Sequence, residues 1–361
     1  MGVNTGMYCL EVGQGSCIVL IDRVPGRPTE SQAALVDVGG DGKQLSKWLD
    51  HYGVKRIVTI ALTHHDDDHI RGLGQIVQAY KRRVDTVWIL PDRIQHPKRL
   101  WLPTQKWRDD GWVRQIKRLE APSVYSPGLG ECITGPFATE YALYCIYPEL
   151  FDVESIVHDA PRTGEPLGAG PNAISAVLRV AIPTAAPTSL DETHVLIGGD
   201  LDYLGWSHLV KTGHDLSAHV FVAPHHGGPG HASAAFQASD LVDAVRPSTA
   251  LVSVGTEKNS GAKPYGHPHK TLIQALKNSG AHVMCTQITP QCVSNPAAVI
   301  RGGAVIPRDP SAPRLCNSGV GCAGTVVVRL TDTSRPDVAR IPEHLSAIKL
   351  LQATGHSPLC R

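Results

Sequence analysis

The sequence is poor in aromatic residues and has no excess of charge of either sign. Phe, Trp and Tyr make up 5% of its 361 residues, and 34 Lys and Arg face 33 Asp and Glu. A net charge of +1 provides no overall attraction for nucleic acid, so any such binding must come from a local patch. With 42% hydrophobic residues, the composition is that of an ordinary globular protein.

Long apolar runs and a secretory leader are also missing. The longest apolar stretches, such as residues 174–182, are too short and too interrupted to cross a bilayer. No basic, apolar and small-residue pattern at the N-terminus marks a signal peptide. Together with nine cysteines, an odd number, these absences predict a cytoplasmic protein without a transmembrane segment, whose thiols are free or bound to metal.

Histidine is plentiful, and several of the 18 follow apolar segments. The densest cluster is Thr63-His64-His65-Asp66-Asp67-Asp68-His69, which comes directly after the apolar segment 57–62. Three carboxylates crowded together repel one another unless a cation lies among them. Imidazole and carboxylate are usual ligands of divalent metals, so this run predicts half of a metal site.

Other apolar segments end in the same chemistry. Asp37 follows residues 33–36, Asp200 follows residues 194–197, and His225 with His226 follows residues 218–223. Strands and helices alternate along the chain, and sites in α/β proteins usually lie outside strand ends. We therefore expect these groups to converge on the 64–69 run. Separate packed or surface side chains are the alternative, but they would leave the repetition unexplained.

The pattern Thr63-His64-x-Asp66-x-Asp68-His69-x-x-Gly72 resembles the metal signature of the metallo-β-lactamase fold, with Asp66 where a second His usually stands. Within that superfamily, the chain is similar to the hydrolase domain of the ComEC/Rec2 competence proteins. The matching segments appear in family order from residue 8 to about 285. They are Val12-Gly13-Gln14-Gly15, Val36-Asp37-Val38-Gly39, the His64 motif, Asn172 with Ser175, Gly199-Asp200, Pro224-His225-His226-Gly227, and Ser253-Val254-Gly255 with Tyr265-Gly266-His267-Pro268.

This resemblance implies a four-layer αββα sandwich with two divalent metal ions at one edge of the sheets. It places His64 and Asp66 on one ion and Asp68 and His69 on the other. Asp200 would lie between the ions, and His225 would be a further ligand. Asp37 would hold a ligand in place by a hydrogen bond. The residues expected beside the ligands or the substrate are His226, Asn172, Lys263 and Tyr265.

The identity and number of the metal ions stay open at this point. Many superfamily hydrolases have a further His where this chain has Asn172, which leaves one ion short of an imidazole. Zinc is expected first, and the carboxylate-rich set also suits manganese.

The implied chemistry is hydrolysis by a metal-activated water, with Asp68 orienting that water or carrying protons. Such a site suits a phosphodiester, a lactam, a lactone or a thioester. Similarity to the competence hydrolases favours DNA as the substrate of a nuclease or phosphodiesterase, with His267 as a second catalytic residue that meets a phosphate at a helix N-terminus. The alternatives are a small-molecule hydrolase of lactonase or lactamase type and a non-catalytic metal-binding module acting through partners.

Residues 91–130 are predicted to be an insertion in a hydrolase domain of residues 1–285. Between residues 93 and 118, eight Lys and Arg accompany two Asp, and Trp101, Trp107 and Trp112 lie among them. The segment, with a helix expected over residues 107–119, either binds phosphates and stacks on bases or is a solvated helix with packed Trp side chains.

Residues 286–361 are predicted to be a C-terminal extension. Its last strand, about 325–330, should pack on the same domain, and a polar tail follows. Four cysteines fall within the 38 residues from 285 to 322, namely Cys285, Cys292, Cys316 and Cys322. Four thiolates can form a closed structural zinc site. Separate buried thiols are the alternative.

Overall fold

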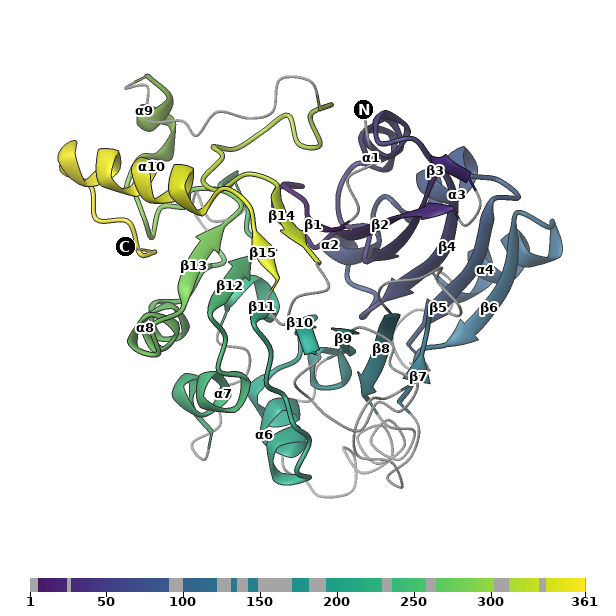
Figure 1. The fold of residues 1–361 in the computed structure, drawn as a ribbon, viewed down its shortest axis with the longest axis horizontal. Helices are drawn as coiled ribbons and strands as arrows, with labels where there is room; N and C mark the ends of the chain where they lie inside the picture. The colour runs from purple at the N-terminus through teal and green to yellow at the C-terminus, as the bar shows by residue number, and fades with distance from the viewer. Residues whose placement is uncertain are drawn as a thin grey trace.

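The computed structural model describes residues 6–24, 27–90, 100–121, 131–134, 142–148, 171–181, 193–228, 236–257, 264–301, 312–330 and 336–360. Two β-sheets dominate this part of the chain. The N-terminal strands and helices, purple to blue, lie on one side of the molecule, and the teal-to-green second half lies on the other (Figure 1).

The first sheet contains eight strands in the order β15-β14-β1-β2-β3-β4-β5-β6. Strands β3 to β6 run parallel, and the remaining neighbours pair antiparallel. Their bounds are β1 (Gly6–Cys9), β2 (Ile18–Val24), β3 (Arg27–Val36), β4 (Val54–Leu62), β5 (Val84–Ile89), β6 (Val113–Arg118), β14 (Val326–Arg329) and β15 (Asp337–Val338).

The second sheet has the order β13-β12-β11-β10-β9-β8-β7, with β10 to β13 parallel. Its strands are β7 (Glu131–Cys132), β8 (Ala142–Tyr147), β9 (Val177–Ala181), β10 (Thr193–Ile197), β11 (Val220–Val222), β12 (Thr249–Val252) and β13 (His282–Cys285).

Alternating apolar side chains create three stacked cores. On β2, Leu20 points into the core between the sheets, whereas its neighbour Val19 points to the outer face. On β10, Val195 and Leu196 divide between the inner core and the opposite outer face in the same way. Successive side chains of a strand point to opposite faces, so each sheet must be covered on both sides.

Helices provide the outer cover. The first sheet carries α1 (Gly42–His51), α3 (Leu73–Ala79) and α4 (Trp101–Asp109), and the second carries α6 (Tyr203–Lys211), α7 (Ala238–Val245), α8 (Lys270–Asn278) and α10 (Ile341–Ala353). Short helices α2 (Asp67–Ile70) and α9 (Pro296–Arg301) complete the described set. The layers therefore run helix, sheet, sheet, helix, which confirms the predicted αββα class.

Two elements differ from the sequence-based expectations. The helix expected over residues 107–119 is wrong, because α4 ends at Asp109 and residues 113–118 form the edge strand β6. An edge strand buries few side chains, so β6 lacks the apolar alternation that marks a central strand. The polar tail contains α10, which buries Ile348 and Leu351 in the second outer core.

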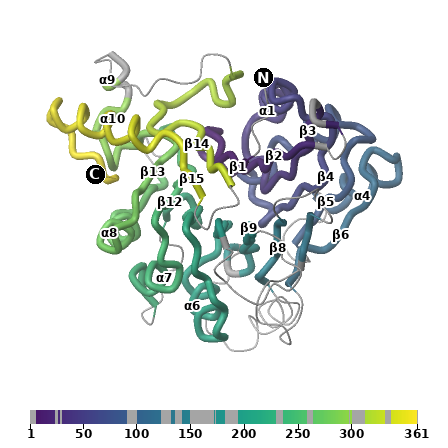
Figure 2. The backbone as a smooth tube through the Cα atoms, in the orientation of Figure 1, coloured from purple at the N-terminus to yellow at the C-terminus, as the bar shows by residue number. Residues whose placement is uncertain are grey.

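The C-terminal part of the chain returns to the N-terminal strand. β14 pairs antiparallel with β1, so that Met7 lies opposite Val328, and the strand expected near residues 325–330 thus joins the first sheet. Figure 2 shows the yellow and purple traces side by side at this point. Among the described helices, none is both long and apolar enough to cross a membrane.

Candidate metal centre

The candidate site lies where several strands of both sheets end. Strand β3 leads into Asp37, β4 leads into His64, β10 leads into Asp200 and β11 leads into His226. All four strands are parallel to a neighbour in their sheet, so their carboxyl ends meet at one edge.

Asp200 occupies the middle of a group of imidazoles. Its carboxylate oxygens lie 3.6 Å from His64 Nε2, 3.2 Å from His69 Nε2 and 3.8 Å from His226 Nε2. The carboxylate is almost fully buried, with a side-chain exposure of 5%. One carboxylate with both oxygens facing imidazole nitrogens is placed to contact two cations at once.

Two groups of three ligand atoms share this volume. His64, His69 and Asp200 form one group, and Asp68, His69 and His226 form the other, with all ligand atoms in each group within 4.8 Å of one another. Within the second group, His226 Nε2 lies 3.2 Å from Asp68 Oδ2 and 3.3 Å from His69 Nε2. Asp66 Oδ2 adds a further oxygen 3.7 Å from His64 Nε2.

Hydrogen bonds from the far side of two imidazoles set their orientation. His69 Nδ1 donates to Asp37 Oδ2 at 2.7 Å, and His226 Nδ1 donates to the Ser253 carbonyl oxygen at 2.8 Å. With a proton assigned to each Nδ1, the Nε2 atoms of the neutral rings turn their lone pairs towards the shared volume. Asp37 is itself fixed, because the amide and the hydroxyl of Thr63 each donate to it at 2.8 Å.

The residues present fit divalent metal ions. His64 Nε2 is buried and accepts or donates no hydrogen bond among the described residues, although it faces two carboxylates. A buried polar atom without a hydrogen bond is costly unless an unseen partner satisfies it. Imidazole nitrogens and carboxylate oxygens, four or more within a few ångströms, are the donor set that zinc and manganese accept.

Electrostatics in the cluster are strongly coupled. Burial alone would raise the pKa of Asp200, but His69, His226 and His64 outweigh it and hold that pKa well below its usual value. Burial likewise opposes charge on His69, yet Asp200 and Asp37 raise its pKa well above the usual value. For His64, burial dominates and lowers the pKa, with the nearby His69 adding to the effect. The cluster therefore combines an ionised Asp200, a neutral His64 ring and a His69 ring that favours the protonated form, and a metal ion bound at His69 Nε2 would replace the proton there.

The backbone around the site is held in left-handed conformations. Asp37, His225 and His226 have φ angles of 60°, 50° and 53°, values that non-glycine residues adopt at a cost. Backbone hydrogen bonds hold the loops together: Ser16 N–H donates to the Asp68 carbonyl oxygen at 3.0 Å and Gly39 N–H to the Ser16 carbonyl oxygen at 2.9 Å. Such local strain persists only where surrounding contacts enforce it, as these loops do.

His225, the histidine that the resemblance implied as a ligand, lies outside the two ligand groups. His225 Nε2 lies 3.5 Å from Asn172 Nδ2, and His225 belongs to neither group of three ligand atoms. Its ring centre is 5.2 Å from that of His267. The geometry thus favours His226 over His225 as the ligand beside Asp68. Sequence reasoning could not separate them, because neighbouring side chains diverge and only the turn decides which one faces inward.

The remaining predicted residues form a second row above the cluster. His267 stacks on His226 with ring centres 6.1 Å apart, and Tyr265, which is 56% exposed, lies 5.9 Å from His267. Burial, with His226 and His225 adding to it, lowers the pKa of His267 to about 4, so its ring is neutral at pH 7. Lys263 lies outside the described residues.

Sequence reasoning quoted Ser175 and Ser253 among the matching segments but assigned no role to their hydroxyl groups, which support the site. Ser175 Oγ accepts a hydrogen bond from the Asp200 amide at 2.8 Å, and Ser253 Oγ donates to the Gly15 carbonyl oxygen at 2.7 Å. Thr63 was quoted only as the start of the motif, although it binds both oxygens of Asp37. The position of Thr63 directly between a strand and the His/Asp run was the available signal.

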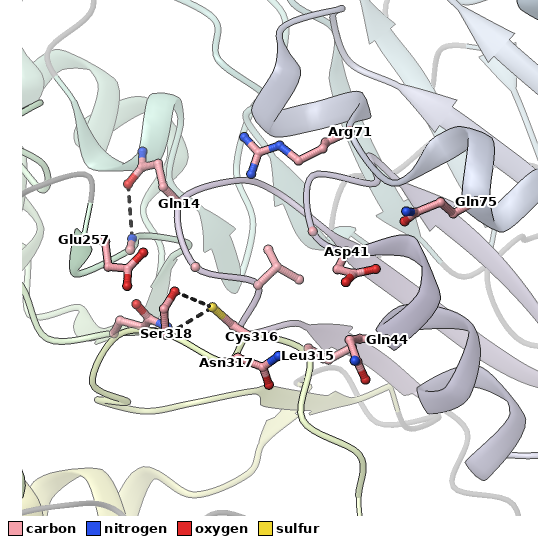
Figure 3. A pocket seen from close by; sticks show the side chains of 15 residues that line it. Gln14, Asp41, Gln44, Arg71, Gln75, Glu257, Leu315, Cys316, Asn317 and Ser318 are labelled. Carbon is pink, nitrogen blue, oxygen red and sulfur yellow. Dashed lines mark hydrogen bonds between the residues drawn. The ribbon is translucent and has the colours of Figure 1, made fainter.

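A pocket of about 380 Å³ lies beside this centre (Figure 3). The Gly13–Gln14 turn and Arg71 line it, but no member of the two ligand groups does. Arg71 is the one cation among its lining residues, against the carboxylates of Asp41 and Glu257. The pocket is therefore of mixed charge and is not a cationic groove.

Comparison with known proteins agrees with the fold and the cluster. Residues 10–131 match the family model described as the metallo-beta-lactamase superfamily, a range that includes the His64 motif. Residues 10–131 are thus similar to the metallo-β-lactamase superfamily, and the αββα layers and the His/Asp cluster agree with the resemblance that the motifs indicated.

Within that class, the chain is similar to ComE operon protein 3 of Bacillus subtilis (strain 168). The two are 23% identical over 295 residues, which is 77% of this chain and 31% of that protein. This chain thus spans about a third of the length of that relative. The similarity is the one that the ordered motifs indicated.

Two further comparisons are more limited. A 56-residue segment is 38% identical to hydroxyacylglutathione hydrolase of Pseudomonas savastanoi pv. phaseolicola (strain 1448A / Race 6), covering 16% of this chain and 21% of that enzyme. The crystal structure of unliganded yeast PDE1 covers 78% of this chain and 97% of its own, at 12% identity and a TM-score of 0.45. That structural likeness is too distant to assign chemistry.

Proposed function

We propose that this protein is a metal-dependent phosphodiesterase that cleaves DNA with a metal-activated water. The observation that carries the proposal is the position of Asp200 between the imidazoles of His64, His69 and His226. A carboxylate shared between two cation positions is typical of two-metal hydrolases, in which paired ions stabilise the attacking and leaving oxygens of a phosphodiester.

In this proposal, His64, Asp66 and Asp200 hold one ion, and Asp68, His69, His226 and Asp200 hold the other. When bound, the ions supply Lewis acidity and lower the pKa of water. Zinc is proposed first and manganese second, as for other mixed nitrogen and oxygen donor sets.

The chain's own residues then handle protons and orientation. Burial would raise the pKa of Asp68, but its hydrogen bond with His226 lowers it, so Asp68 stays ionised and can orient a water molecule by accepting a hydrogen bond from it. His267 is neutral and stacks above His226, where the one ring nitrogen that carries a proton can donate a hydrogen bond to a phosphate oxygen. Asp37 keeps the His69 ring turned towards the ions.

A row of strand residues supports a polyanionic substrate. Leu62, which precedes the metal motif, pairs with Ile89, and Ile89 pairs with Arg118 on the edge strand β6. Two inter-strand spacings of about 4.8 Å put the Arg118 backbone roughly 10 Å from the start of the motif. Arg118 is exposed, as is Arg71 directly after the motif. These cations can contact phosphates on either side of the scissile bond.

Cleavage assays test this function directly. Metal-loaded protein is incubated with single-stranded and double-stranded DNA, and Asp68→Ala is expected to lose cleavage. Asp67→Ala is the matched control, because Asp67 is the exposed neighbouring carboxylate and lies outside both ligand groups. Wild-type protein that binds metal but leaves both DNA forms intact would contradict the proposal.

A second candidate is supported by the segment similar to hydroxyacylglutathione hydrolase. The same cluster suits attack on a thioester or lactone carbonyl, because two cations can stabilise an oxyanion as well as a phosphorane. Turnover of an acylglutathione or a lactone, lost in Asp68→Ala, would establish this candidate. A protein inert towards all three substrate classes would instead be a metal-binding module acting through partners.

The proposed location is the cytoplasm. None of the nine cysteines, all of which lie in the described part of the chain, forms a disulfide, which is the state expected in a reducing compartment.

A further inference from the structure

A second cluster of metal-type side chains lies far from the His/Asp centre in the sequence. Three members, Cys322, His344 and Cys360, have ligand atoms within 4.8 Å of one another, and all three are buried. Cys285 and Cys292 are also buried and lie against Cys360. We call these five residues the Cys–His cluster.

Four members of this cluster come from separate parts of the chain. Cys285 ends strand β13, His344 lies in the first turn of α10, and Cys360 follows that helix. Backbone hydrogen bonds fix the loop that carries Cys322, because its amide donates to the Thr286 carbonyl oxygen at 3.0 Å. Residues far apart in the chain thus converge on one small buried volume.

Two distances within the cluster match the edges of a zinc tetrahedron. Cys285 Sγ lies 3.8 Å from Cys360 Sγ, and Cys322 Sγ lies 3.4 Å from His344 Nε2. Two thiolates bound at about 2.3 Å in tetrahedral geometry are about 3.8 Å apart, and a thiolate and an imidazole are about 3.6 Å apart. A disulfide would bring the two sulfur atoms to about 2.05 Å, so Cys285 and Cys360 are separate thiols.

The histidine of the cluster has the orientation of a metal ligand. His344 points Nε2 at Cys322 Sγ, and its other nitrogen, Nδ1, lies 3.2 Å from His282 Nε2. A ligating imidazole usually donates its second N–H to a fixed acceptor, which sets the tautomer. With a proton assigned to Nδ1, His282 is that acceptor and His344 Nε2 presents its lone pair to the thiols.

We propose that Cys285, Cys322, His344 and Cys360 bind one structural zinc ion. Three thiolates and one imidazole form a closed tetrahedral set, which leaves no position for substrate and distinguishes this site from the His/Asp centre. Cys292 packs against Cys360 next to the ion. The zinc ion ties α10 and the segment after it to the second sheet, where their apolar side chains are already buried.

This ligand set differs from the one indicated by sequence spacing. Cys316, which spacing placed in a zinc site with Cys285, Cys292 and Cys322, instead donates from Sγ to the Ser318 carbonyl oxygen at 3.1 Å and lines the pocket of Figure 3. His344 and Cys360 take part because α10 brings them back to β13. Sequence spacing could not reveal that return.

Zinc analysis of the full-length protein tests the site. Cys322→Ser and Cys360→Ser are each expected to lose one zinc ion per chain relative to wild type. Cys316→Ser is the matched control and keeps the wild-type zinc content. Equal zinc content in wild type and Cys360→Ser would overturn the proposal, and so would a wild-type mass showing that Cys285 and Cys360 are joined by a disulfide.

Cobalt substitution gives a readout that the His/Asp centre cannot produce. Sulfur-to-cobalt charge-transfer absorption requires thiolate ligands, and the ligand groups at the His/Asp centre contain only nitrogen and oxygen. We expect this absorption in wild type and Cys316→Ser and its loss in Cys285→Ser. If Cys285→Ser keeps the band and Cys292→Ser loses it, the assignment of Cys285 is overturned.

A conservative variant separates metal loss from misfolding. His344→Cys replaces one zinc ligand by another, so it should retain zinc and strengthen the cobalt charge-transfer band by adding a fourth thiolate. If folded His344→Cys shows an unchanged charge-transfer band, the role of His344 is overturned. This test does not depend on the serine variants, which could lose zinc because they unfold.

Discussion

Two adjacent histidines meet the metal centre in different ways, although both have left-handed backbone angles. His226 Nε2 lies 3.2 Å from Asp68 Oδ2, whereas His225 contacts Asn172. We expect His226→Ala to lose the ion beside Asp68 and to lower kcat/KM at least 100-fold, a loss of about 2.7 kcal/mol or more in transition-state stabilisation. His225→Ala should keep the metal content of the wild type.

Metal analysis and steady-state kinetics on the two variants decide this assignment. The comparison is well matched, because both substitutions remove an imidazole from the same left-handed turn. Metal loss in His225→Ala with full retention in His226→Ala would reverse the assignment.

Asp37 acts through His69 and does not itself face the metal volume. Asp37→Asn removes the negative charge that holds the Nδ1 proton of His69. Partners of this kind typically contribute 10–100-fold to metal affinity, so a loss of about that size is expected in chelator competition. Asp215→Asn, which alters a carboxylate outside both ligand groups, should leave metal affinity unchanged.

Asp215 also provides a prediction for pH. Burial would raise its pKa, but Ser217 donates to Asp215 Oδ1 from its hydroxyl at 2.6 Å and its amide at 2.8 Å, and the pKa is lowered. A lowered carboxyl pKa stabilises the fold above the unfolded value of about 3.9, and this stabilisation is lost as pH falls through the folded value.

Asp215→Asn should therefore unfold more easily at neutral pH. We expect its free energy of unfolding at pH 7 to fall by about 1 kcal/mol, the contribution of a hydrogen bond to a partly exposed group. In urea titrations, the difference from wild type should shrink below about pH 4. A difference that stays constant from pH 7 to pH 3 would contradict this origin.

At the residue scale, the sequence predicted which types of metal-ligand residue are present better than it predicted which of their side chains face the site. The run from His64 to His69, Asp37 and Asp200 was visible because each follows an apolar strand, and the structure brings His64, Asp68, His69 and Asp200 into one volume with Asp37 behind His69. The choice between His225 and His226 was not visible, because it depends on the turn at φ values of 50° and 53°. The Ser and Thr contacts depend on distant loops and left a weak pattern.

Among the elements, the three loops at the metal centre are locked together by their backbones. A Cβ atom on Gly39 would lie 1.8 Å from the Asp68 carbonyl oxygen and 2.8 Å from the Ser16 amide nitrogen. Gly39→Ala must therefore push the metal motif away from its neighbours, and we expect a loss of about 2 kcal/mol or more in unfolding free energy. Metal affinity should fall with it.

The control for this prediction lies in a nearby helix. A Cβ atom on Gly74, in α3, would lie 3.7 Å from Trp107, an ordinary contact distance. Gly74→Ala should leave metal binding intact and stabilise the protein by up to about 1 kcal/mol, because alanine favours a helix. Denaturant titration of both variants measures their unfolding free energies. If Gly39→Ala is no less stable than Gly74→Ala, the close approach of Gly39 to the Asp68 carbonyl oxygen does not matter for stability.

The edge strand β6 provides the element-scale test of substrate class. Arg118→Ala should raise KM for DNA several-fold, leave kcat unchanged and reduce the salt dependence of binding by about one ion. Arg329 on β14 is the matched control, since it is an exposed arginine near the opposite edge of the same sheet. An equal effect of Arg329→Ala would show that only overall charge matters.

Elements were predictable from sequence where one face is buried and not where side chains remain exposed. The central strand β4 buries Ile57, Ile60 and Leu62, so its apolar run is clear. β6 has four exposed residues in its pattern, and its cationic sequence resembles a solvated helix instead. Tertiary pairing with β5 decides its conformation, and no local pattern reports that pairing.

On the scale of the whole molecule, the proposed metal centre draws its ligands from both halves of the sandwich. His64, Asp68 and His69 come from the first sheet, and Asp200 and His226 from the second. Without metal ions, the carboxylates and the imidazoles from the two sheets can interact only with one another. Ligand linkage at metal concentrations 100-fold above Kd is worth about 2.7 kcal/mol, so chelation should lower stability by roughly that amount.

Calorimetry with and without chelator measures this contribution, and added zinc should restore the original Tm. The variant Asp68→Ala is expected to respond less to chelator than wild type, because one ion is already weakened. An identical response in both proteins would place the chelator-sensitive metal elsewhere in the molecule.

The pairing of β1 with β14 also has a consequence for biosynthesis. Met7 finds its partner only when Val328 has been made, so the edge of β1 stays open while the rest of the chain emerges from the ribosome. At about 5–20 residues per second, that interval is on the order of tens of seconds. An open strand edge can pair with other chains, so we expect the nascent protein to need protection of this edge until β14 has been made.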